Sequence, residues 1–225
     1  MILTELQQIT KTYIHTGADN HVLQGVDLQL EEKGYIAVTG PSGSGKSTLL
    51  QLLGGMMAPT SGTLLFKGES LYNRSEEELS AYRNGSVGFI FQDHKLLPQF
   101  TVLENVLLPV LAQQKTATPA HIERAIYLLG KTAMDSLSGR MPMQLSGGEC
   151  QRVAICRALM MKPALILADE PTGSLDARTA NGVVALLSEL QQSEGAAVVL
   201  VTHSQRIAQA ARKTYALEEG KLHLQ

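Results

Sequence analysis

The chain has 225 residues, of which 44 % are hydrophobic and 18 % are charged, and its formal net charge is −2. This length and composition indicate a globular protein with one sizeable core, or a core with a small subdomain, and they exclude a disordered chain. The weak net charge and the absence of tryptophan argue against a nucleic-acid-binding protein, because such proteins need a basic surface and aromatic side chains for base stacking.

The N-terminus and the two cysteines bear on the cellular compartment. Residues 1–5 lack the basic start and apolar core of a signal peptide. No apolar run approaches the roughly 20 residues that a membrane-spanning helix needs. Cys150 and Cys156 are predicted to lie on different turns of one helix, too far apart for a disulfide, which favours reduced, structural thiols and a reducing compartment. We therefore expect a soluble chain whose membrane role, if it has one, depends on a partner.

The first part of the chain is predicted to form strands. Mixed alternation of apolar and polar residues indicates strands over 1–13 and 22–30, with a turn at 17–20 between them. The continuous apolar run Tyr35–Thr39 is typical of a strand that is buried on both faces. The next predicted elements are a helix over 47–57 and short strands over 63–66 and 87–91.

The pattern changes at Asp93. Helical patterns over 102–112, 119–129 and 149–161 have no strand between them, so we expect an inserted helical subdomain over residues 93–161. Strand–helix alternation then resumes, which predicts a mostly parallel core sheet. The predicted elements of this last part are strands over 164–168 and 197–202, helices over 177–193 and 204–211, and a hairpin formed by 215–218 and 221–224.

A glycine-rich loop after the strand Tyr35–Thr39 has the Walker A form G-x-x-x-x-G-K-[ST]. Its backbone N–H groups and the N-terminus of the following helix form a cradle for phosphate. We expect Lys46 to reach the outer phosphates of a nucleoside triphosphate and Ser47 to offer a hydroxyl to Mg²⁺. A Ser/Gly turn with an unrelated lysine is the plainer alternative, which the position between a buried strand and a helix disfavours. The loop consists of Gly40, Pro41, Ser42, Gly43, Ser44, Gly45, Lys46, Ser47 and Thr48.

Polar residues also end two later apolar strands. Asp169 and Glu170 follow the run 164–168, and adjacent carboxylates at the end of a buried strand need a cation nearby. We expect Asp169 in the Mg²⁺ shell and Glu170 as a general base or water-orienting group, with ordinary surface acids as the alternative. His203 follows the run 197–202, and because parallel sheets bind ligands at their carboxyl edge, we expect it near the γ-phosphate and not in a purely structural role.

A second glycine-containing loop, Leu145–Glu149, is a feature that a monomeric nucleotide-binding protein does not need. With this loop in place, the chain resembles the ATP-binding subunits of ABC (ATP-binding cassette) transporters over nearly its whole length. The resemblance implies an α/β P-loop NTPase fold in which residues 1–92 and 162–225 form a RecA-like core with an N-terminal antiparallel β portion. It also implies ATP and Mg²⁺ as ligands, ATP hydrolysis as the activity, and catalytic roles for Lys46, Gln92, Glu170 and His203.

The resemblance further implies a site that two copies of the chain share. Ser146, Gly147 and Gly148 match the signature loop, which binds the γ-phosphate of ATP held by the second copy. Asp176 matches the D-loop, which crosses the interface of this head-to-tail dimer.

Two more residues match functional positions of the family within one subunit. Gln92 matches the Q-loop glutamine, which contacts Mg²⁺ and water and links the helical subdomain to the core. Tyr13 matches the aromatic residue that stacks on adenine, although a single tyrosine in a strand is commonly a packing residue.

A finer resemblance concerns the residues 89–92, 96–98, 101–106 and 171–176, which look like the lipoprotein-releasing and macrolide-exporter branch. This implies a separate integral membrane permease subunit, driven mechanically by ATP, and a peripheral position at the cytoplasmic face of the inner membrane. Cys150 departs from the family, whose members usually carry glutamine there. We expect alkylation of this thiol to slow hydrolysis by crowding the dimer interface.

Three other functions remain open at this point. A soluble ABC ATPase without a transport role usually carries two cassettes or a long coiled coil in one chain, and neither pattern is present. A regulatory module that signals through a membrane protein to a cell-wall enzyme would have the same cassette. A small-molecule P-loop kinase would share the loop 40–48 but leave Leu145–Glu149 without a purpose.

Overall fold

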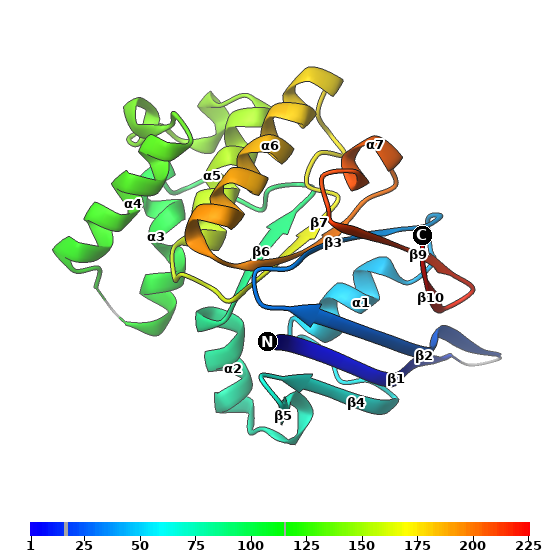
Figure 1. The fold of residues 1–225 in the computed structure, drawn as a ribbon. Helices are drawn as coiled ribbons and strands as arrows, with labels where there is room; N and C mark the ends of the chain where they lie inside the picture. The colour runs from blue at the N-terminus through cyan, green and yellow to red at the C-terminus, as the bar shows by residue number, and fades with distance from the viewer. Residues whose placement is uncertain (16–17, 115) are drawn as a thin grey trace.

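The computed structural model describes residues 1–15, 18–114 and 116–225, and two sheets organise this part of the chain (Figure 1). One sheet has four antiparallel strands in the order β2-β1-β4-β5, and the other has six strands in the order β10-β9-β3-β8-β7-β6. The strands are β1 (Ile2–His15), β2 (Ala18–Glu31), β3 (Tyr35–Thr39), β4 (Ser61–Phe66), β5 (Glu69–Ser70), β6 (Val87–Phe91), β7 (Leu165–Asp169), β8 (Ala197–Val201), β9 (Lys213–Glu218) and β10 (Lys221–Leu224).

The helices pack around these sheets, with α3 to α6 gathered on one side of the six-stranded sheet (Figure 1). Between residues 93 and 161, the described part of the chain contains helices and 3₁₀ turns and no strand. The helical elements are α1 (Lys46–Leu53), η1 (Leu71–Asn73), α2 (Glu76–Gly85), α3 (Val102–Gln113), α4 (Pro119–Lys131), η2 (Asp135–Leu137), η3 (Pro142–Gln144), α5 (Gly147–Leu159), α6 (Ala177–Glu194) and α7 (Gln205–Ala208).

The register of the six-stranded sheet brings the ends of four parallel strands together. Val38 of β3 pairs with Val201 of β8, which pairs with Asp169 of β7, which pairs with Phe91 of β6. Each of these residues lies at or next to the carboxyl end of its strand, so the loops that follow emerge along one edge. The predicted α/β fold, with a parallel-rich core sheet and an antiparallel N-terminal portion, is confirmed.

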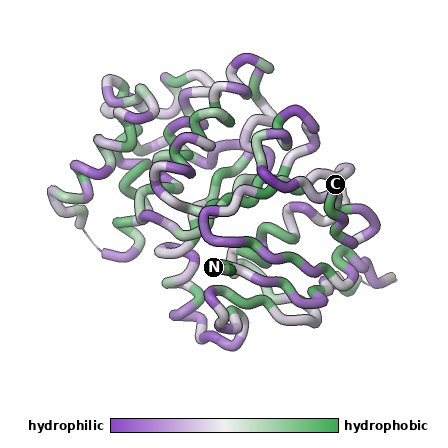
Figure 2. The backbone as a smooth tube through the Cα atoms, in the orientation of Figure 1, coloured by the Kyte–Doolittle hydropathy of each residue, from purple (hydrophilic) through white to green (hydrophobic). Residues whose placement is uncertain are grey.

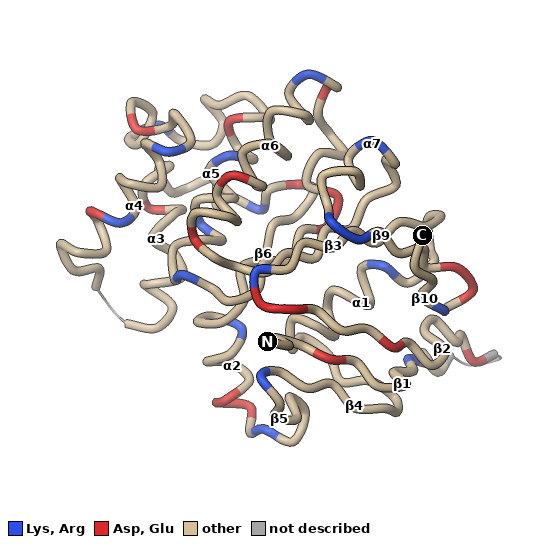
Figure 3. Tube along the Cα trace, in the orientation of Figure 1, with Lys and Arg blue, Asp and Glu red and all other residues tan. Residues whose placement is uncertain are grey.

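Alternate residues of the central strands enter two hydrophobic cores. In β7, Leu165 and Leu167 join a core that includes α1 and the four-stranded sheet, whereas Ile166 and Ala168 join a core formed with α3 to α6. The central strands are accordingly green in Figure 2, and in Figure 3 basic and acidic residues are interspersed along the remaining trace. Burial on both faces is the physical reason why these strands read as continuous apolar runs.

Some predicted boundaries are wrong. The helix predicted over 47–57 ends at Leu53, because the chain leaves the helical conformation at Gly55, whose φ is 68°. The turn predicted at 17–20 is displaced, since β2 already begins at Ala18 and its pairing with β1 reaches His15. Gly17, where that predicted turn begins, lies outside the described residues.

Helix α2 was not predicted, although its sequence carries a start signal. The Ser75 side chain accepts a hydrogen bond from the Glu78 N–H, and the Glu78 carboxylate accepts one from the Ser75 N–H at 2.8 Å. This is a capping box, which the pattern S-x-x-E announces. The buried Tyr82 then fixes α2 to the end of α1, because its hydroxyl donates to the carbonyl of Leu53 at 2.6 Å.

Candidate nucleotide-binding site

The loop between β3 and α1 leaves a helix N-terminus without a side-chain cap. Gly43 and Gly45 have φ values of 80° and 103°, which residues with a Cβ adopt only under strain. Gly45 is the N-cap of α1, and no side chain accepts a hydrogen bond from the first turn. Because the first N–H groups of a helix lack intrahelical partners, this end of α1 suits an anion.

Lys46 adds a buried positive charge at the same place. Its side chain is only 8 % exposed, and its ammonium donates to the carbonyls of Gly40 at 2.9 Å and Pro41 at 2.8 Å. Among the described residues, no carboxylate forms an ion pair with it. The ammonium of Lys46 therefore has two backbone carbonyls as its hydrogen-bond partners and is available to phosphate oxygens.

Asp169 lies at the carboxyl end of β7 and faces this loop. Burial raises the pKa of its carboxyl group, and the neighbouring charge of Glu170 acts in the same direction. Hydrogen bonding from Ser47 and the charge of Lys46 act in the opposite direction without cancelling the effect of burial. A partly buried carboxylate with a raised pKa is stabilised by a cation, so this position suits a divalent ion.

Glu170 is held in an unusual backbone conformation. Its φ of 46° lies in the left-handed region, which costs energy for a residue with a side chain. Its N–H donates to the carbonyl of Val201 at 3.0 Å, and its carbonyl accepts from the Gly173 N–H at 2.9 Å. Its carboxylate lies 2.9 Å from Nδ1 of His203, whose side chain is 70 % exposed. The His203 ring is thus placed to orient the Glu170 carboxylate.

These groups line one cavity of about 520 Å³. Its chemistry fits a magnesium nucleotide, because a helix N-terminus and a lysine suit phosphate, and Mg²⁺ is commonly held by one or two carboxylates together with phosphate oxygens. The structure therefore brings together residues that lie far apart in the sequence. The cavity is lined by Val22, Ser42, Gly43, Gly45, Lys46, Ser47, Thr48, Gln92, Asp169, Glu170 and His203. Val22 is the lining residue that the sequence did not suggest, since an apolar residue in a strand carries no signal.

Tyr13 lies beside α1 and not in the lining of this cavity. Its hydroxyl is 3.5 Å from the Thr48 hydroxyl and 3.4 Å from the Met57 sulfur, and the Lys11 ammonium lies 5.4 Å from the ring centroid. The predicted stacking on adenine remains a prediction. Among the other loop residues, Gly40 and Pro41 supply the carbonyls that hold Lys46, and the buried hydroxyl of Ser44 makes no hydrogen bond to the described residues.

The second glycine-containing loop does not line the cavity of its own chain. Ser146 is the N-cap of α5 in a capping box, in which its N–H and hydroxyl donate to the Glu149 carboxylate at 2.7 and 2.8 Å. These hydrogen bonds lower the pKa of Glu149. Ser146 and Gly147 are exposed and Gly148 is buried, so the loop presents a short polar surface to the outside.

Gly148 packs against the start of α6. A Cβ at Gly148 would lie 2.5 Å from the Thr179 methyl group, so a larger residue requires Thr179 to shift. Asp176 is the N-cap of α6 and accepts hydrogen bonds from the N–H groups of Arg178 and Thr179 and from the Thr179 hydroxyl. The predicted signature and D-loop residues are thus neighbours, in a group separate from the cavity.

The two cysteines are free and buried, in agreement with the expected reduced thiols. Cys150 belongs to the hydrophobic core, its sulfur lies 3.7 Å from the carbonyl of Pro142, and burial raises its pKa. Cys156 is also buried, which raises its pKa to about 12. The expectation that alkylation of Cys150 slows hydrolysis by crowding the dimer interface stays a prediction, for a thiol that is buried in the core and has a raised pKa.

A second cavity of about 240 Å³ was not predicted from the sequence. It lies where β6 meets α5, and its lining includes the aromatic side chains of Phe89 and Phe91 and the cations Arg83, Lys95 and Arg157. No carboxylate is among its lining residues. The lining residues come from α2, β6, α3, α5 and the segments that follow β6 and α5, so only the tertiary structure assembles them.

Known proteins of similar sequence and structure cover nearly the whole chain. Residues 23–173 match the family model described as ABC transporter. The lipoprotein-releasing system ATP-binding protein LolD of Legionella pneumophila is 46 % identical over 224 residues, which cover 99 % of this chain and 97 % of that protein. LolD 1 of Rhodopirellula baltica is 44 % identical over 217 residues, which cover 96 % of this chain and 94 % of that protein.

Two solved structures of one cassette are similar to the whole fold. The dimeric structure of MJ0796, a bacterial ABC transporter cassette, is 36 % identical with a TM-score of 0.88, and the match covers 98 % of this chain and 96 % of that one. A dimeric post-hydrolysis state of MJ0796 bound to ADP and Pi is 35 % identical with the same TM-score and the same coverage.

Proposed function

The chain belongs to the ABC transporter family of ATP-binding cassettes, and we propose that it powers a membrane complex that releases lipoproteins. Within this family it is an ATP-binding subunit and an ATPase. The observation that carries the ATPase assignment is the cavity in which the cap-free N-terminus of α1, Lys46, Asp169 and Glu170 converge. The likeness to LolD over nearly the full length supports lipoprotein release.

The residues around the cavity divide the work of hydrolysis. The N–H groups of α1 and the ammonium of Lys46 bind phosphate oxygens and offset their charge. Ser47, Gln92 and Asp169 are the residues that would hold Mg²⁺, which when bound neutralises charge on the phosphates. Glu170 accepts a proton from water or orients it, and His203 holds the Glu170 carboxylate in place.

A second copy of the chain completes the site in this proposal. Ser146 and Gly147 are exposed and lie outside the cavity of their own chain, where they have no phosphate to bind. A head-to-tail dimer would set them against the nucleotide of the partner, and the similar cassette MJ0796 has been solved as a dimer. ATP then closes the dimer, and hydrolysis opens it.

A membrane permease subunit on another chain would receive this movement. Of the helices described, none is long and apolar enough to cross a bilayer. We assign the second cavity to the membrane partner, because it combines apolar and cationic groups at the junction of the sheet and the helices of residues 93–161. In this view residues 93–161 move as a subdomain, and the chain sits at the cytoplasmic face of the inner membrane.

A trapped dimer tests the shared site. Glu170→Gln is expected to bind ATP, to lose turnover by ~10²–10⁴, and to form a stable dimer measurable by light scattering. Adding Ser146→Arg to this variant should abolish the dimer while ATP still binds, because the arginine side chain is too large for a loop that must approach the partner's nucleotide closely. A dimer that survives Ser146→Arg contradicts the head-to-tail arrangement.

Copurification tests the membrane role. The tagged chain, extracted in detergent, is expected to bring down a membrane permease, and depletion of the chain should cause lipoproteins to accumulate in the inner membrane. Recovery of a cell-wall enzyme regulator instead would favour a signalling module. Recovery of no membrane chain from a competent extract would favour a soluble ABC ATPase.

A further inference from the structure

The segment after Gln92 contains a turn of two consecutive left-handed residues. His94 and Lys95 have φ values of 47° and 50°, although neither is glycine. Such residues are uncommon singly, and a pair persists only where the surroundings hold it. Within the segment, the N–H groups of His94 and Lys95 donate to the carbonyls of Phe91 and Asp93, the ion pair of Lys95 with Asp93 is largely exposed, and the Leu96 N–H reaches His94 Nδ1 only at 3.4 Å. None of these bonds uses the carbonyl of His94 or of Lys95.

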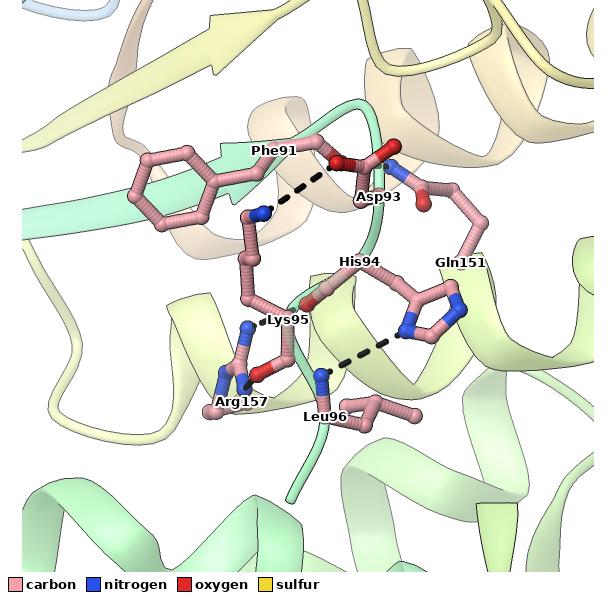
Figure 4. A network of polar contacts seen from close by, with 7 residues as sticks. All are labelled: Phe91, Asp93, His94, Lys95, Leu96, Gln151 and Arg157. Atoms are coloured by element: carbon pink, nitrogen blue, oxygen red, sulfur yellow. Dashed lines mark hydrogen bonds and ion pairs between the residues drawn. The ribbon is translucent and has the colours of Figure 1, made fainter. Parts of the chain in front are cut away.

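Arg157 of α5 donates hydrogen bonds to the two carbonyls of this turn. Its guanidinium donates to the carbonyl of His94 and to the carbonyl of Lys95, each at 2.6 Å (Figure 4). Because both residues have left-handed φ values, their carbonyls point to the same side, where the two terminal nitrogens of one guanidinium reach them. Arg157 makes no ion pair among the described residues, and burial lowers its pKa, so its charge serves these carbonyls and not a carboxylate.

The same helix also holds the other end of the segment. The buried side chain of Gln151 donates through Nε2 to the carbonyl of Phe91 at 3.1 Å, directly before Gln92 (Figure 4). Gln92 lines the nucleotide cavity, whereas Phe91, Lys95 and Arg157 line the second cavity. The segment 91–95 therefore joins the two cavities. Helix α5 donates hydrogen bonds to this segment on both sides of Gln92, through Gln151 and Arg157.

We propose that Arg157 is a positioning residue, which holds the His94–Lys95 turn and thereby fixes Gln92 relative to α5. Helix α5 begins at the loop of Ser146, and Arg157 lies about 15 Å further along its axis. A displacement of α5 at either end then moves the backbone beside Gln92. This inference rests on the proposed role of Gln92 in hydrolysis.

The test compares kinetic constants of full-length variants. Arg157→Lys keeps a positive charge but loses the fork, and it is expected to lower kcat roughly 10–100-fold while the KM for ATP stays within about twofold, because the α1 end of the cavity is unchanged. Arg74→Lys is the matched control, since Arg74 pairs with an exposed Glu69 away from both cavities, and wild-type kcat is expected. Thermal unfolding of each variant shows whether a loss of kcat merely follows a loss of stability.

A glycine rescue separates positioning from packing. Glycine adopts left-handed φ freely, so Lys95→Gly added to Arg157→Lys should recover about fivefold or more of the lost kcat. No recovery, or a kcat that falls only in step with thermal stability, would overturn the inference. If Gln92→Ala leaves kcat unchanged, the proposed role of Gln92 fails. If Gln92→Ala lowers kcat but Arg157→Lys does not, only the role of Arg157 fails.

Discussion

The N-termini of α1 and α5 both lie in glycine-containing loops, yet only that of α5 has a side-chain cap. Helix α1 has Gly45 as its N-cap, no side-chain cap and Lys46 in its first turn. Helix α5 has Ser146 as its N-cap, and its own Glu149 closes a capping box. The first turn of α1 therefore has no side-chain cap, whereas in α5 the Ser146 side chain accepts from the Glu149 N–H and the Glu149 carboxylate accepts from Ser146.

The glycines of the two loops also serve different purposes. Gly43 is required for its left-handed φ and not for its small size, since a Cβ there would meet nothing within 4 Å. Gly148 is required for its small size, since a Cβ there would collide with Thr179 of α6. The comparison teaches that a Gly-rich loop can be a phosphate cradle by conformation in one place and a packing junction in another.

Removal of the charge from the open helix end is expected to have the largest effect. Lys46→Ala should lower kcat/KM for ATP by about 10²–10³, because a positioned cation at the phosphates is lost. The measurement is steady-state hydrolysis, together with binding of a fluorescent ATP analogue. Lys221→Ala, on the exposed strand β10, is the control and should match the wild type. Near-normal turnover in Lys46→Ala would contradict the view that the N-terminus of α1 is the phosphate-binding end of the site.

Alanine at each glycine sharpens the contrast between conformation and packing. Gly148→Ala should reduce the free energy of unfolding by about 1–3 kcal/mol through overpacking, measured with urea. Thr179→Ser should relieve this loss, because it removes the methyl group and keeps the hydroxyl bound to Asp176. Gly43→Ala should cost about 1–2 kcal/mol through its φ, and Thr179→Ser should not relieve it. Equal rescue of both variants would contradict the distinction.

Asp169→Asn tests the cost of burying the ionised Asp169 carboxylate beside the N-terminus of α1. Because burial raises the pKa of Asp169, its ionised form is destabilising, and the variant should have a higher free energy of unfolding than the wild type at pH 7 while it loses ATPase activity. The gain should shrink as the pH falls through the raised pKa of Asp169, where the wild-type carboxyl is also neutral. A gain that persists at lower pH would assign the effect to another cause.

Ser146→Ala tests the closed helix end, with a smaller expected effect. Loss of the cap should cost about 1 kcal/mol in the free energy of unfolding, and Ser75→Ala at the matching capping box of α2 should cost a similar amount. Only Ser146→Ala should also slow hydrolysis. The lowered pKa of Glu149 means that its cap stabilises the fold above the ordinary glutamate pKa and is lost as the pH falls through the lowered value. Equal ATPase activity in both variants would leave Ser146 a structural cap.

The sequence by itself determined the fold class and the phosphate-binding end of the site. Buried parallel strands must be apolar on both faces, so β3, β7 and β8 can be recognised in the sequence as continuous apolar runs. Because these strands are parallel, the polar residues that follow them lie along one edge of the sheet. Even the missed helix α2 had a readable signal in Ser75 and Glu78, because a capping box is a local interaction.

Tertiary structure alone decided what depends on contacts between distant elements. It turned the Cys150 thiol into the core, set Thr179 against Gly148, and placed Arg157 under the carbonyls of His94 and Lys95. None of these follows from local propensity, since each depends on how one helix packs against a segment far away in the chain. Local patterns specify which groups are available, and packing specifies which of them meet.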